Sequence, residues 1–143
     1  MKVFLDTSII VEIDRKNAEV IRLIRKLIDN DHDILVSTVT ISEILTGSYL
    51  RKNFKEAVME AKKILGQFLW IDLDAKIAEK TAQYLAYLIA EGGIIEYQDA
   101  AIAATFTVAE ANYLLTLNKR HFEAIPDLKG RVYSPEEFSR VLK

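Results

Sequence analysis

Short apolar segments of strand length alternate with longer amphipathic segments along the chain, and this alternation restricts the fold more than any other feature of the sequence. The expected strands are residues 2–5, 34–37, 70–73, 113–117 and 131–133. The expected helices are residues 18–30, a segment from about residue 40, residues 54–69, the segment between Asp74 and Gly92, residues 97–110, and a terminal segment. Strands that alternate with helices form a parallel sheet covered on both faces, so we expect an α/β fold.

Local signals at the helix ends support this division. Ser134 is followed by Pro135 and, at the third helical position, by Glu137, which is a capping-box pattern at the start of the terminal helix. Asp74 is a candidate cap for the helix before Gly92–Gly93, in which Ile89 belongs to the expected buried face. These signals predict where helices begin and which faces they bury.

The chain is expected to form one domain over residues 1–143. It contains only five Gly and two Pro, and no segment has the composition of a linker, a repeat or a low-complexity region. A hydrophobic content of 50% predicts a sizeable buried core. The longest apolar stretch, residues 100–109, is about half of the roughly 20 residues that a membrane span needs, and residues 1–6 are too short for a signal peptide. We therefore expect a cytoplasmic protein without membrane contact.

The residue counts exclude several kinds of chemistry. The chain has no Cys, so it has no thiolate nucleophile, disulfide or cysteine-based zinc site. Two histidines, His32 and His121, cannot form a three-histidine metal site. A formal net charge of −2, from 19 basic and 21 acidic residues, disfavours a dedicated duplex-DNA binder but leaves transient contact with RNA open. What remains for catalysis is carboxylate chemistry.

Three acidic residues are expected to gather at one edge of the sheet. Asp6 directly follows the first strand, Glu43 lies just after the second, and Asp99 begins the Ala-rich helix that leads into the fourth. Ligands of parallel sheets bind outside the carboxyl ends of the strands. Carboxylates in such a cluster repel one another unless a hard cation holds them together, and ligation by oxygen alone suits Mg²⁺ or Mn²⁺. The sequence therefore predicts a metal site at Asp6, Glu43 and Asp99.

Each of these acids also has a purely structural interpretation. Asp6 is suited to cap a helix that starts near Ser8, and Thr40 with Glu43 matches the T-x-x-E capping box. Asp99 lies in a first helical turn, where the helix dipole favours an acid. At this point both interpretations stay open.

Uncharged and basic residues complete the candidate site. Thr116 and Asn118, at the end of the fourth strand, are candidate contacts to a phosphate or to the waters of a metal, or else ordinary turn residues. Positive charge for a substrate is offered by residues 15–16, 51–55 and 119–120, which include Lys119 and Arg120, although short charged runs are often solvated surface. Tyr49 and Tyr97 are candidate stacking partners for single-stranded bases or core residues.

Four segments in order resemble the PIN-domain family, and in particular the VapC-type toxins of toxin–antitoxin pairs. They are residues 3–10 (VFLDTSII), 37–44 (STVTISEI), 99–105 (DAAIAAT) and 114–122 (LLTLNKRHF), followed by 125–128 (IPDL). The resemblance implies a three-layer α/β/α sandwich with a parallel sheet of four to five strands, and an endoribonuclease that depends on Mg²⁺ or Mn²⁺. It also implies that Asp6, Glu43 and Asp99 are the invariant acids, and that the partners are RNA, a cognate VapB-type antitoxin and a second copy of the chain.

The resemblance also suggests roles for the neighbouring residues. Thr7 or Ser8 would orient a water on the metal, Thr116 would hydrogen-bond the scissile phosphate, and His121 would carry a proton or contact a phosphate. The family often has a further acid at the place of Asn118 or His121, and its absence here leaves open whether one or two metals bind. Glu96, one turn before Asp99, is a candidate substitute or an exposed first-turn residue.

Two alternative functions remain at the level of sequence. One is a PIN-like scaffold that binds RNA or a protein but does not cut. The other is a phosphatase of the haloacid dehalogenase type, because residues 4–8 resemble the start of its nucleophile motif. That motif needs a second acid two residues after the first, where this chain has Ser8.

Overall fold

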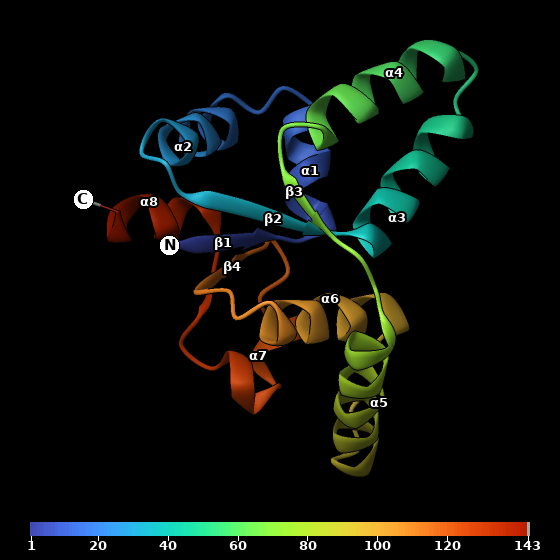
Figure 1. Cartoon of the computed structure of the whole chain (residues 1–143), viewed down its shortest axis with the longest axis vertical. Helices are drawn as coiled ribbons and strands as arrows, with labels where there is room; N and C mark the ends of the chain where they lie inside the picture. The colour runs from blue at the N-terminus through green and yellow to red at the C-terminus, as the bar shows by residue number, and fades with distance from the viewer. Residues whose placement is uncertain (143) are drawn as a thin grey trace.

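A computed structural model describes residues 1–142 of the chain (Figure 1). Its elements follow one another in this order: β1 (Lys2–Leu5), α1 (Thr7–Asp14), α2 (Ala18–Asp29), β2 (Asp33–Ser37), α3 (Thr38–Tyr49), α4 (Phe54–Leu65), β3 (Leu69–Ile71), α5 (Ala75–Ala90), α6 (Tyr97–Val108), β4 (Tyr113–Leu115), α7 (Arg120–Glu123), the 3₁₀ turn η1 (Pro126–Leu128), β5 (Val132–Tyr133) and α8 (Pro135–Val141). The expected α/β fold is confirmed.

The sheet has five parallel strands in the order β3-β2-β1-β4-β5. Leu5, at the end of β1, pairs with Val36 of β2 on one side and with Leu115 of β4 on the other. The three central strands therefore end at the same edge, and the residues that follow them are brought together there.

Alternate strand residues bury into two separate cores, one on each face of the sheet. Val3 and Leu5 pack with the apolar faces of α1, α2 and α8 and with the end of α4. Phe4, between them, points to the opposite face and packs with α5, α6 and α7. This period of two is expected for strands that are covered on both faces. Figure 1 shows the resulting three layers, with α1, α2 and α4 on one side of the sheet and α6 and α7 on the other. The packing of Phe138 with the residues of α1 and α2 places α8 on the first side.

Helices α3 and α4 form an arm that extends away from the sheet (Figure 1). The tip of the arm is apolar: the rings of Tyr49 and Phe54 lie 6.4 Å apart, and Leu50 between them is 83% exposed. Within residues 1–142, no helix is both long and apolar enough to cross a bilayer.

Some local expectations are confirmed and others are wrong. Asp74 caps α5, and Ser134 and Glu137 form the predicted capping box of α8. The capping box proposed for Thr40 and Glu43 does not exist, because α3 begins three residues earlier with Ser37 as its cap. Glu43 thus lies beyond the first turn, where its carboxylate is not needed by the helix end.

Two other differences concern helices α1 and α5. Helix α1, expected only as a helix that starts near Ser8, occupies residues 7–14 immediately after β1. Ile89, expected on the buried face of α5, is 67% exposed, and Tyr84 is buried instead. The hydroxyl of Tyr84 bonds to Thr107, at 2.6 Å, and to Asp127, at 2.7 Å, so contacts distant in the sequence decide which face of this helix is covered.

Candidate active site

The predicted acidic residues share one edge of the sheet. Asp6 follows β1, Glu43 lies on the helix that follows β2, and Asp99 lies in the first turn of α6. Thr116 directly follows β4, next to β1 in the sheet. Because open parallel sheets bind ligands at the carboxyl ends of their strands, this edge is the candidate active site.

Asp6 is almost fully buried and firmly held. Its side chain is the cap of α1: Oδ1 accepts hydrogen bonds from the backbone N–H of Ser8 at 2.8 Å and from the Ser8 hydroxyl at 2.5 Å. Oδ2 accepts a third hydrogen bond, from the Thr116 hydroxyl, at 2.5 Å. An ionised carboxylate has about four acceptor sites, so the cap role leaves one for a ligand. The capping interpretation of Asp6 is therefore confirmed, and it does not compete with a role in a metal site.

The two hydroxyls that hold Asp6 also fix the loop after β4. Ser8 Oγ accepts a hydrogen bond from the backbone N–H of Leu117 at 3.0 Å, and Thr116 Oγ1 accepts one from the backbone N–H of Asn118 at 2.9 Å. The single proton of each hydroxyl is donated to Asp6, so neither is left to donate to a phosphate. Ser8 and Thr116 are thus placed to orient Asp6, and the exposed side chain of Asn118 lies just beyond them.

Glu43 is held by a short chain of hydroxyls. Its Oε1 accepts a hydrogen bond from Thr7 Oγ1 at 2.7 Å, and Thr7 Oγ1 lies 3.0 Å from the hydroxyl of the buried Thr40. Because the Thr7 proton goes to Glu43, Thr40 is the donor to Thr7. Thr40 was not among the predicted site residues. Its T-x-x-E spacing to Glu43 was the available signal. That spacing predicted a helix cap, whereas Thr40 takes part in a hydrogen-bonded chain that links α3 to α1.

Asp99 is paired with His121. Its Oδ2 lies 2.9 Å from His121 Nδ1, with the Asp99 side chain 20% exposed and the His121 side chain 53% exposed. Both residues line a cavity of about 410 Å³ that is also bounded by Glu96 and Arg120. The structure thus brings His121 to the acidic edge, as the sequence predicts, but through a carboxylate.

The environment raises the pKa of all three carboxyl groups. For Asp6 the cause is burial, which the hydrogen bonds from Ser8 and Thr116 offset in part. For Glu43, burial of the carboxyl group raises the pKa, and the negative charges of Asp99 and Asp6 raise it further. For Asp99, burial raises the pKa and the neighbouring His121 lowers it. The raised values show that the three charges are incompletely compensated by the protein.

The donor chemistry at this edge fits a hard divalent cation. The side chains offer carboxylate and hydroxyl oxygens, and the repulsion that Glu43 experiences is the kind that a cation relieves. Within residues 1–142, however, no three acidic or histidine side chains lie close enough together to chelate one ion as they stand. To hold one ion with Asp6, the side chains of Glu43 and Asp99 would have to turn away from their present partners, Thr7 and His121.

The remaining substrate-binding candidates divide into two groups. Lys119 is engaged by acids, since its Nζ lies 3.1 Å from Glu137 and 3.5 Å from Glu123. Arg120 lines the cavity beside Asp99, and Tyr97 is 53% exposed at the start of the same helix as Asp99. Positive charge and an aromatic surface are therefore present near Asp99.

Solved structures of other proteins match most of this chain. VapBC2 from Rickettsia felis, solved with a promoter DNA fragment, has a TM-score of 0.85 and 24% identity over 94% of this chain and 98% of that chain. FitAcB from Neisseria gonorrhoeae has a TM-score of 0.77 and 27% identity over 94% and 98%. VapC20 from Mycobacterium tuberculosis has a TM-score of 0.59 and 16% identity over 78% and 86%.

A search of curated protein sequences finds no significant match. The sequence does match the PIN-domain family over residues 3–128, from the first strand to the 3₁₀ turn. This segment contains all three acids of the candidate site and four of the five strands. By this match and by its parallel five-stranded sheet, the chain belongs to the PIN-domain family.

Proposed function

We propose that the chain is a metal-dependent endoribonuclease and the toxin of a VapBC-type toxin–antitoxin pair. The observation that carries the proposal is the meeting of Asp6, Glu43 and Asp99 at the carboxyl edge of a PIN-type sheet. The similar structures support it: VapBC2 is a VapBC protein, and VapC20 is described as a toxin that cleaves the sarcin-ricin loop. The substrate class is therefore RNA.

Asp6, Glu43 and Asp99 are the residues that would hold Mg²⁺ or Mn²⁺ in this proposal. Once bound, such an ion supplies charge neutralisation at the phosphate and lowers the pKa of a water to be used as the nucleophile. The chain supplies geometry: Ser8 and Thr116 fix the direction of Asp6, and Thr7 and Thr40 support Glu43. No side chain is required to form a covalent bond with the substrate.

His121 is assigned as a proton carrier or a phosphate contact. It lies on α7, its ring is half exposed, and its Nδ1 is 2.9 Å from Asp99, which leaves Nε2 directed elsewhere for a phosphate or a proton. Arg120, adjacent on α7 and lining the same cavity, adds positive charge for the RNA backbone. Asn118 and Lys119 border this region, with Lys119 already neutralised by Glu137 and Glu123.

A second candidate function is a PIN-like scaffold that binds without cutting. It is favoured by one observation: within the described residues, the acids do not form a chelating group of three, and Asp99 is occupied by His121. The phosphatase alternative has no such support. The position where it needs a second acid is Ser8, whose hydroxyl donates a hydrogen bond to Asp6.

The proposed partners follow from the same comparison. We infer a VapB-type antitoxin that blocks the acidic edge, and a homodimer of the chain, and we place both in the cytoplasm as predictions. Co-expression of the chain with the product of the adjacent upstream gene, followed by size-exclusion chromatography with light scattering, tests both. Separate elution of the two chains would contradict the antitoxin assignment, and a monomeric mass would contradict the dimer.

The decisive test of the activity is cleavage of defined RNAs with and without Mn²⁺ or Mg²⁺. We expect cleavage that needs the metal and that is lost in Asp6→Asn and Asp99→Asn. Cleavage that both variants retain would contradict the assigned residues. Absence of cleavage of any RNA, together with absence of metal binding by calorimetry, would favour the scaffold.

A further inference from the structure

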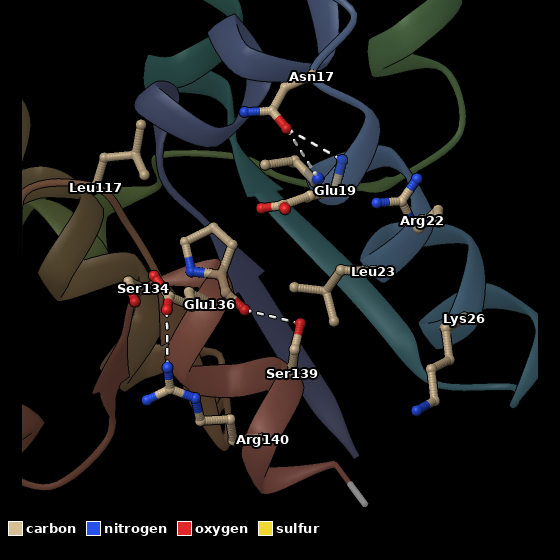
Figure 2. A pocket seen from close by; sticks show the side chains of 12 residues that line it. Asn17, Glu19, Arg22, Leu23, Lys26, Leu117, Ser134, Glu136, Ser139 and Arg140 are labelled. Atoms are coloured by element: carbon tan, nitrogen blue, oxygen red, sulfur yellow. Dashed lines mark hydrogen bonds and ion pairs between the residues drawn. The ribbon is translucent and has the colours of Figure 1, made fainter.

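A groove outside the acidic cluster runs between α2 and α8 (Figure 2). Its volume is about 640 Å³, within the size range of ligand sites. One end is formed by Asn17, Leu117 and Ser134, and the other by Lys26 and Arg140. Leu117 and Ser134 follow β4 and β5, so the first end lies at the same edge of the sheet as the acids.

The walls of the groove carry positive charge, and α2 supplies the cations that, within the described part of the chain, have no acidic partner. Arg22 and Lys26 are four residues apart on α2 and therefore lie one above the other, and Arg140 projects from α8 (Figure 2). Two acids also line the groove, Glu19 and Glu136, but Arg140 donates to Glu136 at 2.8 Å. Among residues 1–142, neither Arg22 nor Lys26 forms an ion pair. Within these residues, two cations without an ion pair therefore face the groove, together with one acid, Glu19, that has no ion pair either.

The surface between these cations is apolar. Val20 and Leu23 of α2, Pro135 of α8 and the half-exposed Leu117 line it. Figure 2 shows Leu23 directed into the space between the two helices. Cations spaced along a groove match a ligand with a regular row of negative charges, and the exposed Leu117 offers an apolar contact at one end; a single nucleic-acid strand has both kinds of group.

The groove is joined to the candidate catalytic residue by hydrogen bonds. The backbone N–H of Leu117, at the end of the groove, donates to Ser8 Oγ at 3.0 Å, and Ser8 Oγ donates to Asp6 at 2.5 Å. A strand lying in the groove therefore arrives at Asp6 without crossing the molecule. This continuity favours RNA, because a substrate strand extends beyond its scissile phosphate and needs a surface of opposite charge beside the reacting atoms.

We propose that the groove between α2 and α8 binds the backbone of single-stranded RNA beside the scissile phosphate, with Arg22 and Lys26 as its phosphate contacts. The proposal rests on the ribonuclease function proposed above and adds a path for the substrate. It assigns a role to residues that lie well outside the acidic motifs.

The first test is RNA binding in the presence of a chelator, so that binding is measured without cleavage. A fluorescein-labelled single-stranded RNA is titrated with wild-type protein, with R22Q/K26Q, and with K62Q/K63Q, whose two exposed lysines lie on α4. The control removes the same charge from another surface. We expect R22Q/K26Q to weaken binding about tenfold and to reduce the slope of log K against log salt by about 1.4, with little change in the control. Equal losses in the two variants, or none, would overturn the proposal.

The second test locates the RNA, using the absence of natural cysteine. Ser139 lies in the groove, so Ser139→Cys gives a single reactive thiol there, and Lys63→Cys gives one on α4. We expect RNA to slow maleimide labelling of the first variant and not of the second. Labelling of Ser139→Cys at the same rate with and without RNA would contradict the proposal. Protection by poly-glutamate as strong as that by RNA would identify an acidic protein segment as the occupant instead.

Cleavage assays separate this proposal from the function on which it rests. If R22Q/K26Q raises the KM for a long single-stranded RNA and leaves kcat unchanged, both proposals are supported. Wild-type cleavage that R22Q/K26Q matches at every RNA concentration would overturn the groove and leave the ribonuclease intact. Absence of wild-type cleavage, with RNA binding still lost in R22Q/K26Q, would overturn the ribonuclease and leave the groove as an RNA-binding site.

Discussion

The two halves of the candidate active site are held in different ways. Asp6 is 3% exposed, and its carboxylate accepts three hydrogen bonds from residues on two neighbouring parts of the sheet edge. Glu43 is exposed and accepts one hydrogen bond, from Thr7, while Asp99 has one contact, with His121. One half is rigid before any ligand binds, and the other is free to adjust.

The difference follows from the elements that carry the acids. Asp6 directly follows a central strand whose register with β4 brings Thr116 against it from 110 residues away. Glu43 and Asp99 extend from helices α3 and α6, so their carboxylates are reached through rotatable bonds and lack a second strand to fix them. If a cation binds here as proposed, the carboxylates of Glu43 and Asp99 would have to turn toward Asp6.

The largest expected effect is the loss of RNA cleavage when Asp6, the rigidly held acid, loses its charge. Asp6→Asn keeps the size of the side chain and removes its charge, so RNA cleavage should fall by more than the roughly 100-fold upper figure for losing an outer partner of a metal site. Circular dichroism should show that the variant folds. Asp127→Asn is the control and should cleave RNA normally. Asp127 is exposed and accepts a hydrogen bond from Tyr84, away from the acidic edge. Full activity in Asp6→Asn would contradict the claim that the rigidly held Asp6 is the more important half of the site.

The next effect concerns the support of Asp6. Thr116→Val leaves Asp6 Oδ2 without its hydrogen bond, which should lower metal affinity by about 10–100-fold and destabilise the fold by about 1–3 kcal/mol. Thr105→Val is matched, because Thr105 is equally buried and its hydroxyl donates only to Ala101 O within α6. Calorimetry and urea unfolding measure the two quantities. If both variants lose stability but neither loses metal affinity, Thr116 has a structural role only.

Removing the hydrogen bond that supports Glu43 should lower metal affinity less than removing the one that supports Asp6. Thr7→Val takes away the one hydrogen bond to a carboxyl group that is far less buried than that of Asp6, so we expect metal affinity to fall by no more than about tenfold. Thr46→Val is the control, because Thr46 lies on α3 with Glu43 and its hydroxyl donates to the backbone oxygen of Ser42 and not to Glu43. A larger loss in Thr7→Val than in Thr116→Val would reverse the proposed order of the two halves.

The smallest effect is a pH dependence of stability. An acid whose pKa is higher in the folded than in the unfolded chain binds more protons when folded, so stability falls as pH rises through the interval above its ordinary value, which is 4.5 for Glu43. Glu43→Gln should therefore be more stable than wild type near neutral pH, and the gain should vanish below about pH 4.

Glu137 provides the opposite case for this measurement. A backbone hydrogen bond from Ser134 and the neighbouring Lys119 lower the pKa of Glu137, so its contribution to stability is present at neutral pH and is lost as pH falls. Glu137→Gln should therefore be less stable than wild type near neutral pH. Urea unfolding across the pH range checks both signs, and changes in the same direction would contradict the account of Glu43.

The sequence predicted what depends on local signals and on strand order. The strands, the cap at Ser134, and the shared edge of Asp6, Glu43 and Asp99 follow from short patterns and from the rule for parallel sheets. Contacts between distant segments were not predictable. The bond from Thr116 to Asp6 requires the strand order, and the bridge from Thr40 through Thr7 to Glu43 requires the position of α1 against α3.

The α2–α8 groove was missed for a related reason. Arg22 and Lys26 belong to the polar face of an amphipathic helix, and nothing in the local pattern distinguishes them from ordinary solvated residues. Only the packing of α8 beside α2 turns them into the wall of a groove. In the same way, the buried face of α5 is decided by Tyr84 and its distant partners instead of by helical periodicity.

The central claim is that the rigid carboxylate of Asp6 is the anchor of a divalent-cation site. Its most direct test is isothermal titration of Mn²⁺ into wild-type protein, Asp6→Asn, and the control Asp33→Asn, which changes an exposed acid at the opposite edge of the sheet, where β2 begins. We expect wild type and Asp33→Asn to bind the ion with equal affinity, and Asp6→Asn to show no binding. Binding of Mn²⁺ by Asp6→Asn with the affinity of wild type would contradict the claim.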